Sequence, residues 1–451
     1  MLDILNITTD SLQILKPLLG LGLIGYSTYG LINKSNNENK ICNYKELNSL
    51  VGDGVLLSKH VRLSVKQSNE HVLMIAPSGC GKSRRFVAHN INRLRNCSII
   101  TNDPSCELEK MCFNTKRKYI LNPFSDKTIG YDPLLNCRNE FEIRKMAGVI
   151  LTNGMKAYAG DNSNQQDWVG MATPLLTSYM LMNYHTHKYT FDEMIKNICT
   201  MPILANIEID KQGNIIGATK SIELDILLSE VESAKTEFDS FIQVKGANQT
   251  LSSIRTVLNS CLQVFLDNNV KKIFRKKNIN FADIRKEESI IYIQIPEHHA
   301  DYFSPLVATF LTQMFDYLLE NDGLQTYFLF DEFTNCGLIP SVSKLLSTAR
   351  KHNISIIAAI QSLVQLYSLY GELQGKELID LFKSLIVCGG LKESGEYISN
   401  ILGNKIFYKN GNKHEEALMT SDKIRMMNED DMLIICKNKR PVLDKMMEIV
   451  A

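Results

Sequence analysis

His71–Ser83 reads HVLMIAPSGCGKS, in which four apolar residues, Val72–Ile75, precede a loop of small residues that ends in Gly-Lys-Ser. An apolar run of that length is typical of a strand buried on both faces of a parallel sheet. The loop fits the phosphate-binding pattern G-x-x-x-x-G-K-[ST], except that Ala76 stands at the position of the first glycine. Apolar residues at helical spacing follow, and Ser98–Thr101 has the character of the next strand. The segment therefore predicts an α/β fold built around a phosphate-binding loop.

Individual residues of this loop have distinct expected roles. Gly79 and Gly81 allow consecutive backbone N–H groups to point inward around an anion, and the start of the following helix adds its dipole. Lys82 would reach the β- and γ-phosphates of a nucleotide, and Ser83 would be a ligand of Mg²⁺. The predicted nucleotide-binding residues are Pro77, Ser78, Gly79, Cys80, Gly81, Lys82, Ser83 and Arg84.

A second apolar run, Thr326–Glu332 (TYFLFDE), ends in two acids. A phosphate loop alone does not distinguish a kinase, a GTPase and a motor. The carboxylates that accompany the loop are therefore needed to identify the class of protein. Asp331 at the end of the predicted strand would hold the Mg²⁺ shell, and Glu332 would orient and deprotonate an attacking water. The alternative is a strand that simply enters a polar turn, but its pairing with the phosphate loop favours the catalytic interpretation.

Two further polar residues flank a third apolar run, Ile354–Ile360 (ISIIAAI). Gln361 follows this run directly, and because ligands bind outside the carboxyl ends of parallel strands, it is a candidate sensor of the γ-phosphate. Its alternative role is to cap the next turn. Arg350 ends the helical stretch Val342–Arg350, and we expect it near the sheet edge, pointing outward as an arginine finger for a neighbouring subunit. A cation that complements a helix carboxyl terminus is an equally good interpretation of Arg350.

The spacing of these motifs predicts an insertion, because about 250 residues between Lys82 and Asp331 are too many for a minimal set of crossovers. Helical apolar spacing with little strand pattern occurs in 165–184, 221–242 and 248–266, and the sheet resumes at Ser289–Ile295. The expected organisation is a membrane anchor (1–35), a nucleotide-binding domain in two parts (36–155 and 285–451) and an inserted all-α domain (156–284).

The amino-terminal run Leu18–Ile32 carries no charge over fifteen residues and lies between Lys16 and Lys34. As a helix it covers about 22 Å, less than the ~30 Å of a hydrocarbon core, although flanking lysines extend such a span. We expect a membrane anchor here, with a buried or interfacial helix as the alternative. The lysines that follow place the rest of the chain in the cytoplasm by the positive-inside rule.

Composition narrows the class of protein further. The 451 residues are 44% hydrophobic and 22% charged, which excludes a wholly disordered or fibrous chain and allows two or three domains. A net charge of +1 argues against a surface covered with basic residues for nonspecific binding of nucleic acid. A few local basic loops that bind nucleic acid are still compatible with this net charge. The eleven cysteines are odd in number and include no C-x-x-C pair, which indicates a reducing compartment without a disulfide framework or zinc knuckle.

Several blocks of this sequence resemble the conserved blocks of the type IV coupling proteins, the membrane-anchored ATPases of conjugation and type IV secretion. They are TNDPSCELE (101–109), DEFTNCGLIP (331–340), STARKHNISIIAAIQSLVQL (347–366) and the stretch 418–446. The resemblance covers most of residues 70–446. It implies a RecA-like domain interrupted by an all-α domain, ATP and Mg²⁺ as cofactors, and assembly into a homo-hexamer.

The resemblance also assigns residues and partners. By motif match, the nucleotide roles fall to Lys82, Ser83, Asp331, Glu332 and Gln361, and the trans-acting arginine is Arg350. The implied partners are single- or double-stranded DNA, a relaxase or other secreted substrate, and the channel ATPases and inner-membrane components of a type IV secretion system. The implied location is the bacterial inner membrane, with the motor domain in the cytoplasm.

Some features depart from the family pattern, and two other functions stay open. Ser105 and Cys106 stand where a Lys-Gly pair is usual, and one hydrophobic segment is found where two are common. A related DNA translocase for partition would act without a secretion channel. A membrane adaptor would use the nucleotide as a switch without translocating anything.

Overall fold

The computed structural model of the protein describes residues 39–46, 52–159, 166–209, 212, 215–244 and 248–450. Its centre is a nine-stranded sheet with the strand order β13-β12-β9-β1-β8-β7-β2-β6-β3. The strands are β1 (Val72–Ile75), β2 (Cys97–Asn102), β3 (Arg117–Leu121), β6 (Ser289–Ile293), β7 (Gln325–Phe330), β8 (Ile354–Ile360), β9 (Ser384–Cys388), β12 (Asp431–Cys436) and β13 (Val442–Lys445). From β9 to β3 all neighbours are parallel, whereas β12 and β13 join as an antiparallel edge. The predicted α/β class with a mostly parallel sheet is confirmed.

Both faces of this sheet are covered, which explains why its central strands are continuous apolar runs. Alternate residues of β1 enter two different cores: Leu73 and Ile75 belong to one, Val72 and Met74 to the other. The first core contains residues of α13 (Ala300–Glu320), α14 (Val342–Ala349), α15 (Leu363–Tyr370) and α16 (Glu372–Leu381), and it continues into the helices between β3 and β6. The second is closed by α3 (Ala88–Arg93), α4 (Leu108–Met111) and the carboxy-terminal tail.

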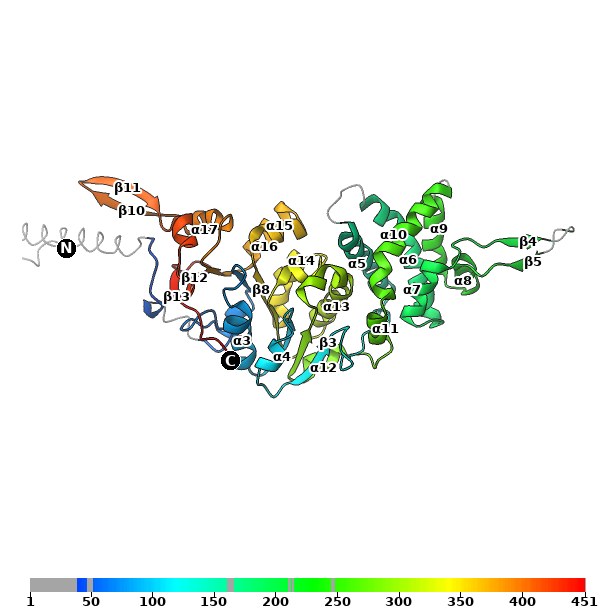
Figure 1. Cartoon of the computed structure of the whole chain (residues 1–451), viewed down its shortest axis with the longest axis horizontal. Coiled ribbons are helices and arrows are strands. Elements are labelled where there is room, and N and C mark those ends of the chain that lie inside the picture. Colours follow the sequence, from blue (N-terminus) through cyan, green and yellow to red (C-terminus); the bar gives the residue numbers. More distant parts are fainter. Residues whose placement is uncertain are drawn as a thin grey trace, which may run out of the picture.

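Between β3 and β6 the chain is mostly helical and forms one end of the elongated molecule (Figure 1). Its elements are α5 (Glu140–Ala159), α6 (Gln166–Thr186), α7 (Phe191–Thr200), β4 (Ile207–Ile209), β5 (Ile215–Ala218), α8 (Ile222–Leu228), α9 (Glu232–Val244), α10 (Asn248–Leu266), α11 (Asn268–Phe274) and α12 (Phe281–Lys286). The antiparallel pair β4–β5 departs from the expectation of an insertion made only of helices.

The position of α5 bears on where the insertion begins. This helix starts at Glu140, sixteen residues before the expected boundary at 156, and packs both on α13 of the sheet domain and on α6 and α10. The division at 156–284 stays a prediction, and we propose that α5 is a helix shared between the two parts.

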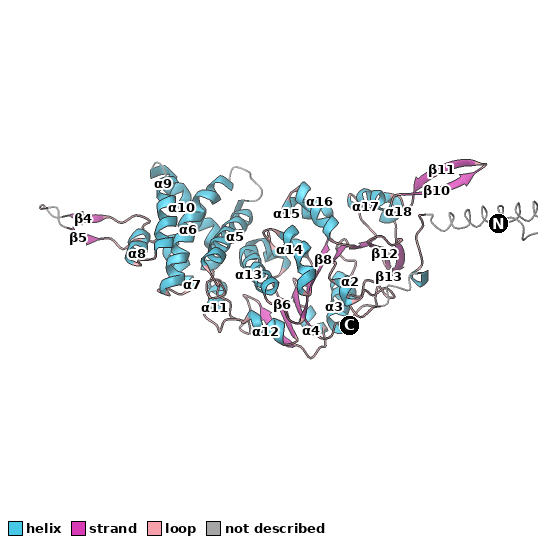
Figure 2. Ribbon diagram, turned by 180° about the vertical axis from the view of Figure 1, so that it is seen from behind, coloured by secondary structure: helices cyan, strands magenta, loops and turns pink. Residues whose placement is uncertain are grey.

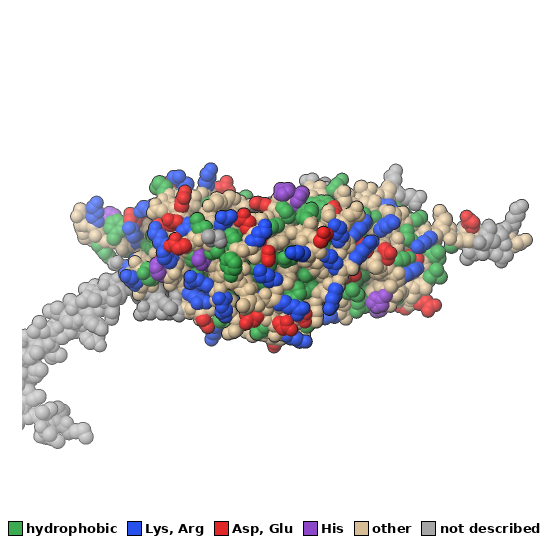
Figure 3. Space-filling model, turned by 60° about the horizontal axis from the view of Figure 1, so that its bottom comes forward, with side chains coloured by type: hydrophobic (Ala, Val, Ile, Leu, Met, Phe, Trp, Pro, Cys, Tyr) green, Lys and Arg blue, Asp and Glu red, His purple; other side chains and the backbone are tan. Residues whose placement is uncertain are grey.

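The opposite end of the molecule carries a hairpin of β10 (Asn404–Lys409) and β11 (Asn412–Ala417), which projects beyond α17 (Ser394–Leu402) and α18 (Ser421–Arg425) (Figures 1 and 2). Figure 3 shows basic and acidic side chains interspersed over the face that it displays, in keeping with the net charge of +1. The expected anchor, 1–35, lies outside the described residues. Among the helices that are described, none has the length and apolar character that crossing a bilayer requires.

Candidate nucleotide site

The phosphate loop leaves the sheet at the carboxyl end of β1. The backbone N–H of Ala76 donates to the carbonyl of Ile360 at 3.0 Å, so the pairing of β1 with β8 continues for one more residue. Gly79 and Gly81 then adopt φ values of 83° and 90°, in the left-handed region that a side chain would strain. Ala76 is buried and has no left-handed φ, which explains why this position accepts a methyl group in place of the usual glycine.

Lys82 begins the helical turns that follow, a π-helical stretch over Lys82–Val87 that continues into α3. Its ammonium group donates to the carbonyl of Ala76 at 2.9 Å and lies 3.8 Å from a carboxylate oxygen of Glu332. The lysine therefore spans the mouth of the loop and faces the acids at the end of β7.

Asp331 lies directly opposite the loop. The Ser83 hydroxyl donates to its Oδ2 at 2.5 Å, while its Oδ1 is buried without a hydrogen-bond partner. Burial raises the pKa of Asp331 to about 6, against the hydrogen bond from Ser83 and the charge of Lys82. A buried carboxylate oxygen left without a partner beside a serine hydroxyl is a donor set that suits Mg²⁺, whose positive charge would stabilise the ionised form.

Glu332 is held by its own neighbours. The Thr334 hydroxyl donates to its Oε1 at 2.9 Å, and burial raises its pKa against the charge of Lys82. Asn102, at the end of β2, accepts a hydrogen bond from the Asp331 N–H and donates to the Glu332 carbonyl, each at 2.7 Å. This amide fixes the backbone that carries both acids, and a raised pKa suits Glu332 to accept a proton.

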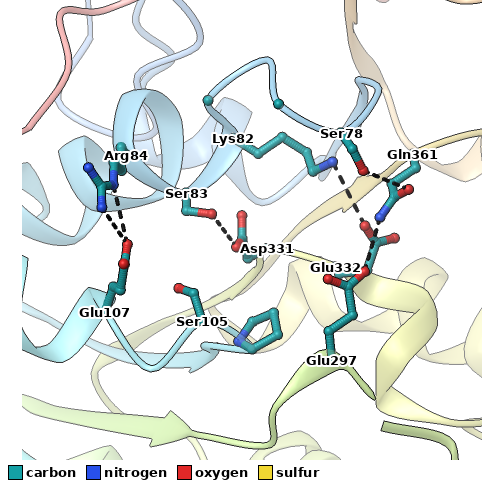
Figure 4. A pocket seen from close by; sticks show the side chains of 13 residues that line it. Ser78, Lys82, Ser83, Arg84, Ser105, Glu107, Glu297, Asp331, Glu332 and Gln361 are labelled. Atoms are coloured by element: carbon teal, nitrogen blue, oxygen red, sulfur yellow. Dashed lines mark hydrogen bonds and ion pairs between the residues drawn. The ribbon is translucent and has the colours of Figure 1, made fainter. Parts of the chain in front are cut away.

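Gln361 joins the two sides of the site (Figure 4). Its carbonyl oxygen accepts from the Ser78 hydroxyl at 3.1 Å, and its amide nitrogen donates to Glu297 at 3.4 Å. It also hydrogen-bonds Glu332, which lowers the pKa of that carboxyl. The side chain thus contacts both the loop and two of the acids.

Together these groups surround a cavity of about 320 Å³. Its lining residues are Ser78, Gly79, Gly81, Lys82, Ser83, Arg84, Pro104, Ser105, Glu107, Glu297, Asp331, Glu332 and Gln361. The structure therefore brings together most of the residues predicted from the sequence, although Pro77 and Cys80 are outside the lining. The functional roles of all the predicted site residues stay predictions.

Sequence reasoning did not place four of these lining residues in the site: Pro104, Ser105, Glu107 and Glu297. The first three follow the carboxyl end of β2, and Glu297 follows that of β6. The rule that ligands bind outside the carboxyl ends of parallel strands could have pointed to them. Glu107 also pairs with Arg84 at 2.8 Å, and this ion pair closes one side of the cavity (Figure 4).

Arg350 does not lie where we expected it. It precedes β8, so it is at the amino edge of the parallel strands, whereas the cavity lies at their carboxyl edge. Its guanidinium pairs at 3.0 Å with Glu70, which precedes β1 and also pairs with Lys437. We expected Arg350 near the edge of the sheet that binds nucleotide, and within its own subunit this prediction is wrong. A residue before a parallel strand and a residue after it lie at opposite edges of the sheet.

Cys80, within the phosphate loop, packs against the core that contains Cys388 at the end of β9. The hydrogen bond from the Cys388 thiol lowers the pKa of Cys80 to about 7, and that of Cys388 is raised correspondingly. The thiolate is the nucleophilic form of cysteine, so Cys80 is expected to be the more reactive of the two.

Iodoacetamide is therefore expected to alkylate Cys80 at least about tenfold faster at pH 7 than Cys106, whose pKa is raised by burial although it too is partly exposed. The Cys80 rate should rise with pH through about 7. Peptide mass spectrometry of timed reactions measures both rates. Equal rates at the two cysteines would contradict this assignment.

The order of the strands defines the class of protein. β8 lies between β1, which leads into the phosphate loop, and β7, which ends before Asp331. Gln361 at the end of β8 is therefore placed between the loop and the acids. A parallel sheet with this arrangement is that of a P-loop NTPase with a RecA-like core.

Comparison with known families makes the assignment specific. The family described as "Type IV secretory system Conjugative DNA transfer" matches residues 31–447. The chain belongs to this family. Protein VirD4 of Rhizobium rhizogenes is 23% identical over 229 residues, which cover 49% of this chain and 34% of that protein. Protein VirD4 of Agrobacterium fabrum matches with the same identity and coverage, so the match spans about a third of the length of these curated relatives.

Solved structures agree on the fold. The plasmid coupling protein TrwB in complex with the non-hydrolysable ATP analogue ADPNP has a TM-score of 0.72 at 17% identity, covering 92% of this chain and 94% of that chain. TrwB with ADP and Mg²⁺ gives 0.71 at 16% identity, covering 92% and 93%. VirB4 of Thermoanaerobacter pseudethanolicus gives 0.53 at 13% identity, covering 89% and 97%. These likenesses show a RecA-like α/β fold.

Proposed function

We propose that this protein is an ATP-driven coupling protein, which recruits DNA or nucleoprotein substrate to a type IV secretion or conjugation channel and helps to pump it. The observation that carries the proposal is the buried pair Asp331–Glu332, held by Asn102 directly opposite Lys82 and Ser83. A second buried acid placed to accept a proton serves ATP hydrolysis, and a protein that only bound the nucleotide would not need it. Membership of the conjugative DNA transfer family supports the choice of cargo.

The geometry suggests how these residues divide the reaction. The loop N–H groups and Lys82 would bind the β- and γ-phosphates, and Ser83 with Asp331 would hold Mg²⁺, which supplies positive charge against the phosphate oxygens. Glu332 would orient the attacking water and accept its proton. Gln361 would exchange its contact with Ser78 or Glu297 for one with the γ-phosphate, and so report the state of the nucleotide to β8.

Partners and location are part of the same proposal. We infer that the substrate is single- or double-stranded DNA with a bound relaxase or another secreted protein, and that the partners are the channel ATPases and inner-membrane components of a type IV secretion system. A homo-hexamer at the bacterial inner membrane, anchored through Leu18–Ile32, is the expected assembly. TrwB supports the nucleotide assignment, because it has been solved with ADP and Mg²⁺ and with an ATP analogue.

The proposal is tested by steady-state ATP turnover with and without single-stranded and double-stranded DNA, at several protein and salt concentrations. We expect DNA to raise turnover, and the rise to shrink with salt as phosphate contacts are screened. Turnover that DNA does not change would favour the nucleotide-switched adaptor. A DNA-stimulated ATPase that fails to pull down channel ATPases or a relaxase would instead be a translocase for partition.

Arg350 is our candidate for an arginine that acts on a neighbouring subunit's nucleotide. Its side chain is 49% exposed and lies outside its own cavity, as that role requires. Turnover per subunit is therefore expected to rise with protein concentration, and Arg350→Ala should remove the rise without weakening nucleotide affinity, since a trans arginine is worth about 10³–10⁵ in rate. Lys351→Ala, which removes the adjacent exposed cation, should leave the rise intact.

A mixing experiment separates the two roles of Arg350. A mixture of the Arg350→Ala protein and the Lys82→Ala protein should regain activity that neither variant has alone. An interface between the two can take its arginine from the Lys82→Ala subunit and its phosphate loop from the Arg350→Ala subunit. If mixing restores nothing and turnover per subunit is independent of concentration, Arg350 serves only its ion pair with Glu70.

A further inference from the structure

The β10–β11 hairpin is the feature of the molecule that the nucleotide site leaves unexplained. It forms a sheet of only two strands and projects from the body at the end opposite the helical insertion (Figures 1 and 2). An isolated two-stranded hairpin is marginally stable in water and normally needs a third strand or a surface to pack on. We therefore expect the hairpin to pack on a binding partner.

The middle of β10 is apolar on both faces, whereas the residues of β11 opposite it, Glu415, His414 and Lys413, are charged or polar. Three consecutive residues, Ile406, Phe407 and Tyr408, are 39%, 38% and 71% exposed. Successive residues of a strand point to opposite faces, so this run puts an exposed apolar side chain on each face of the hairpin, beside a polar residue of β11. Strands with one solvated face alternate apolar and polar residues instead, which makes this run unusual for a surface that meets only water.

Charge is distributed along the hairpin in a gradient. Near the base the two acids are satisfied: Glu416 pairs with Lys405 at 2.7 Å, and Glu415 accepts from the Asn404 amide at 3.0 Å. Near the tip, Lys409 and Lys413 form no ion pair with any residue that the structure describes. Aromatic side chains and unpaired lysines thus share the tip, a combination suited to the boundary between lipid headgroups and acyl chains.

The base of the hairpin is tied to the start of the described chain. The Asn39 side-chain amide donates to the carbonyl of Leu402 at 2.7 Å and to that of Asn404 at 3.2 Å. Asn39 follows Ile32, the end of the uncharged run, by seven residues, a distance of at most about 25 Å along the chain. Six-residue strands make the hairpin about 20 Å long. Its tip can therefore reach the surface of any bilayer that takes up Leu18–Ile32.

We propose that the β10–β11 hairpin docks its tip on the headgroup region of an anionic bilayer. Lys409 and Lys413 would contact lipid phosphates, while Phe407 and Tyr408 would enter the interfacial layer. Six such hairpins in a hexamer would set the height and tilt of the motor over the membrane. The proposal rests on the membrane location proposed above, and it adds a second contact that the anchor alone does not provide.

The test uses the full-length chain, in which Trp168 is the sole tryptophan. The double variant Trp168→Phe/Tyr408→Trp moves this fluorophore to the hairpin tip. The protein is reconstituted into vesicles of brominated phosphatidylcholine, with or without about 30% brominated phosphatidylglycerol as the anionic lipid. We expect a blue shift and strong quenching of the hairpin tryptophan in the anionic vesicles only. Replacing Lys409 and Lys413 with glutamine should weaken this docking by about 25-fold, about 5-fold for each lysine.

A matched control places the tryptophan elsewhere on the surface. Tyr158 is 63% exposed on α5 in the helical insertion, and Trp168→Phe/Tyr158→Trp should show no quenching by the same vesicles. Equal quenching of the two variants would mean nonspecific adsorption and would overturn the proposal.

The remaining outcomes separate this proposal from those it rests on. If the protein floats with vesicles but the hairpin tryptophan is not quenched, the membrane location stands and the docking is wrong. If the protein does not float at all, both the location and the docking are wrong, and ATP turnover in the same sample shows whether the motor function survives. A blue shift that depends on protein concentration and not on lipid would assign the hairpin to a second copy of the chain, which also overturns the proposal.

Discussion

Lys82→Ala is expected to abolish ATP hydrolysis. The lysine is the cation that faces the buried acids, 3.8 Å from Glu332, and it would lie over the β- and γ-phosphates when nucleotide is bound. Without it the loop N–H groups alone do not neutralise the charge that develops on the transferred phosphoryl group. Steady-state phosphate release at saturating ATP measures the loss, which should take turnover to the background of the assay.

A control for this substitution is Lys145→Ala. Lys145 also forms an ion pair, with Asp316 at 2.7 Å, but it lies outside the cavity lining. This variant should keep its turnover, and both variants should keep the thermal unfolding transition of the native protein. Unchanged hydrolysis in a folded Lys82→Ala protein would remove the basis for the nucleotide site.

Glu332→Gln should retain nucleotide binding and slow hydrolysis by about 10²–10⁴-fold, the usual contribution of a general base. Glutamine keeps the size of the side chain and an oxygen for the Thr334 hydroxyl, but it does not accept a proton from water. Fluorescent nucleotide titration measures affinity, and single-turnover hydrolysis measures the chemical step.

The pH dependence of ATP turnover is an independent test of the role of Glu332 as a base. Burial raises the pKa of Glu332, and a base works only when ionised, so turnover of the native protein should fall as pH falls through that raised pKa. Glu332→Gln should lose this limb of the profile. If binding and hydrolysis decline together in the variant, Glu332 is a structural residue or a metal ligand, and the base lies elsewhere.

Much of the site was predictable because its information is local. The strands β1, β7 and β8 are continuous apolar runs, and each is followed at once by the residue it delivers: the phosphate loop, Asp331 and Gln361. In a parallel sheet every such residue emerges at the same edge. Sequence order therefore determined which side chains meet, without knowledge of which strand lies beside which.

The contacts of other residues could not be predicted this way. Glu297 reaches the cavity from a turn after β6, and Asn102 fixes the backbone of both acids from the end of β2. The strand-end rule points to the edge of the sheet where each residue lies, but it does not say which groups each residue contacts. Their roles come from β2 lying beside β7 and β6 beside β2, contacts between segments that are far apart in the chain.

The α/β class, the phosphate loop and the acids opposite it could be predicted from the order of the amino acids alone, because burial on both faces and the conformational needs of the loop act on consecutive residues. Two features became apparent only in the folded chain: Arg350 pairs with Glu70 at the far edge of the sheet, and β10 and β11 stand apart from the sheet. Those outcomes depend on which segments pack together, and the free energy of that packing is spread over many distant contacts that no short pattern records.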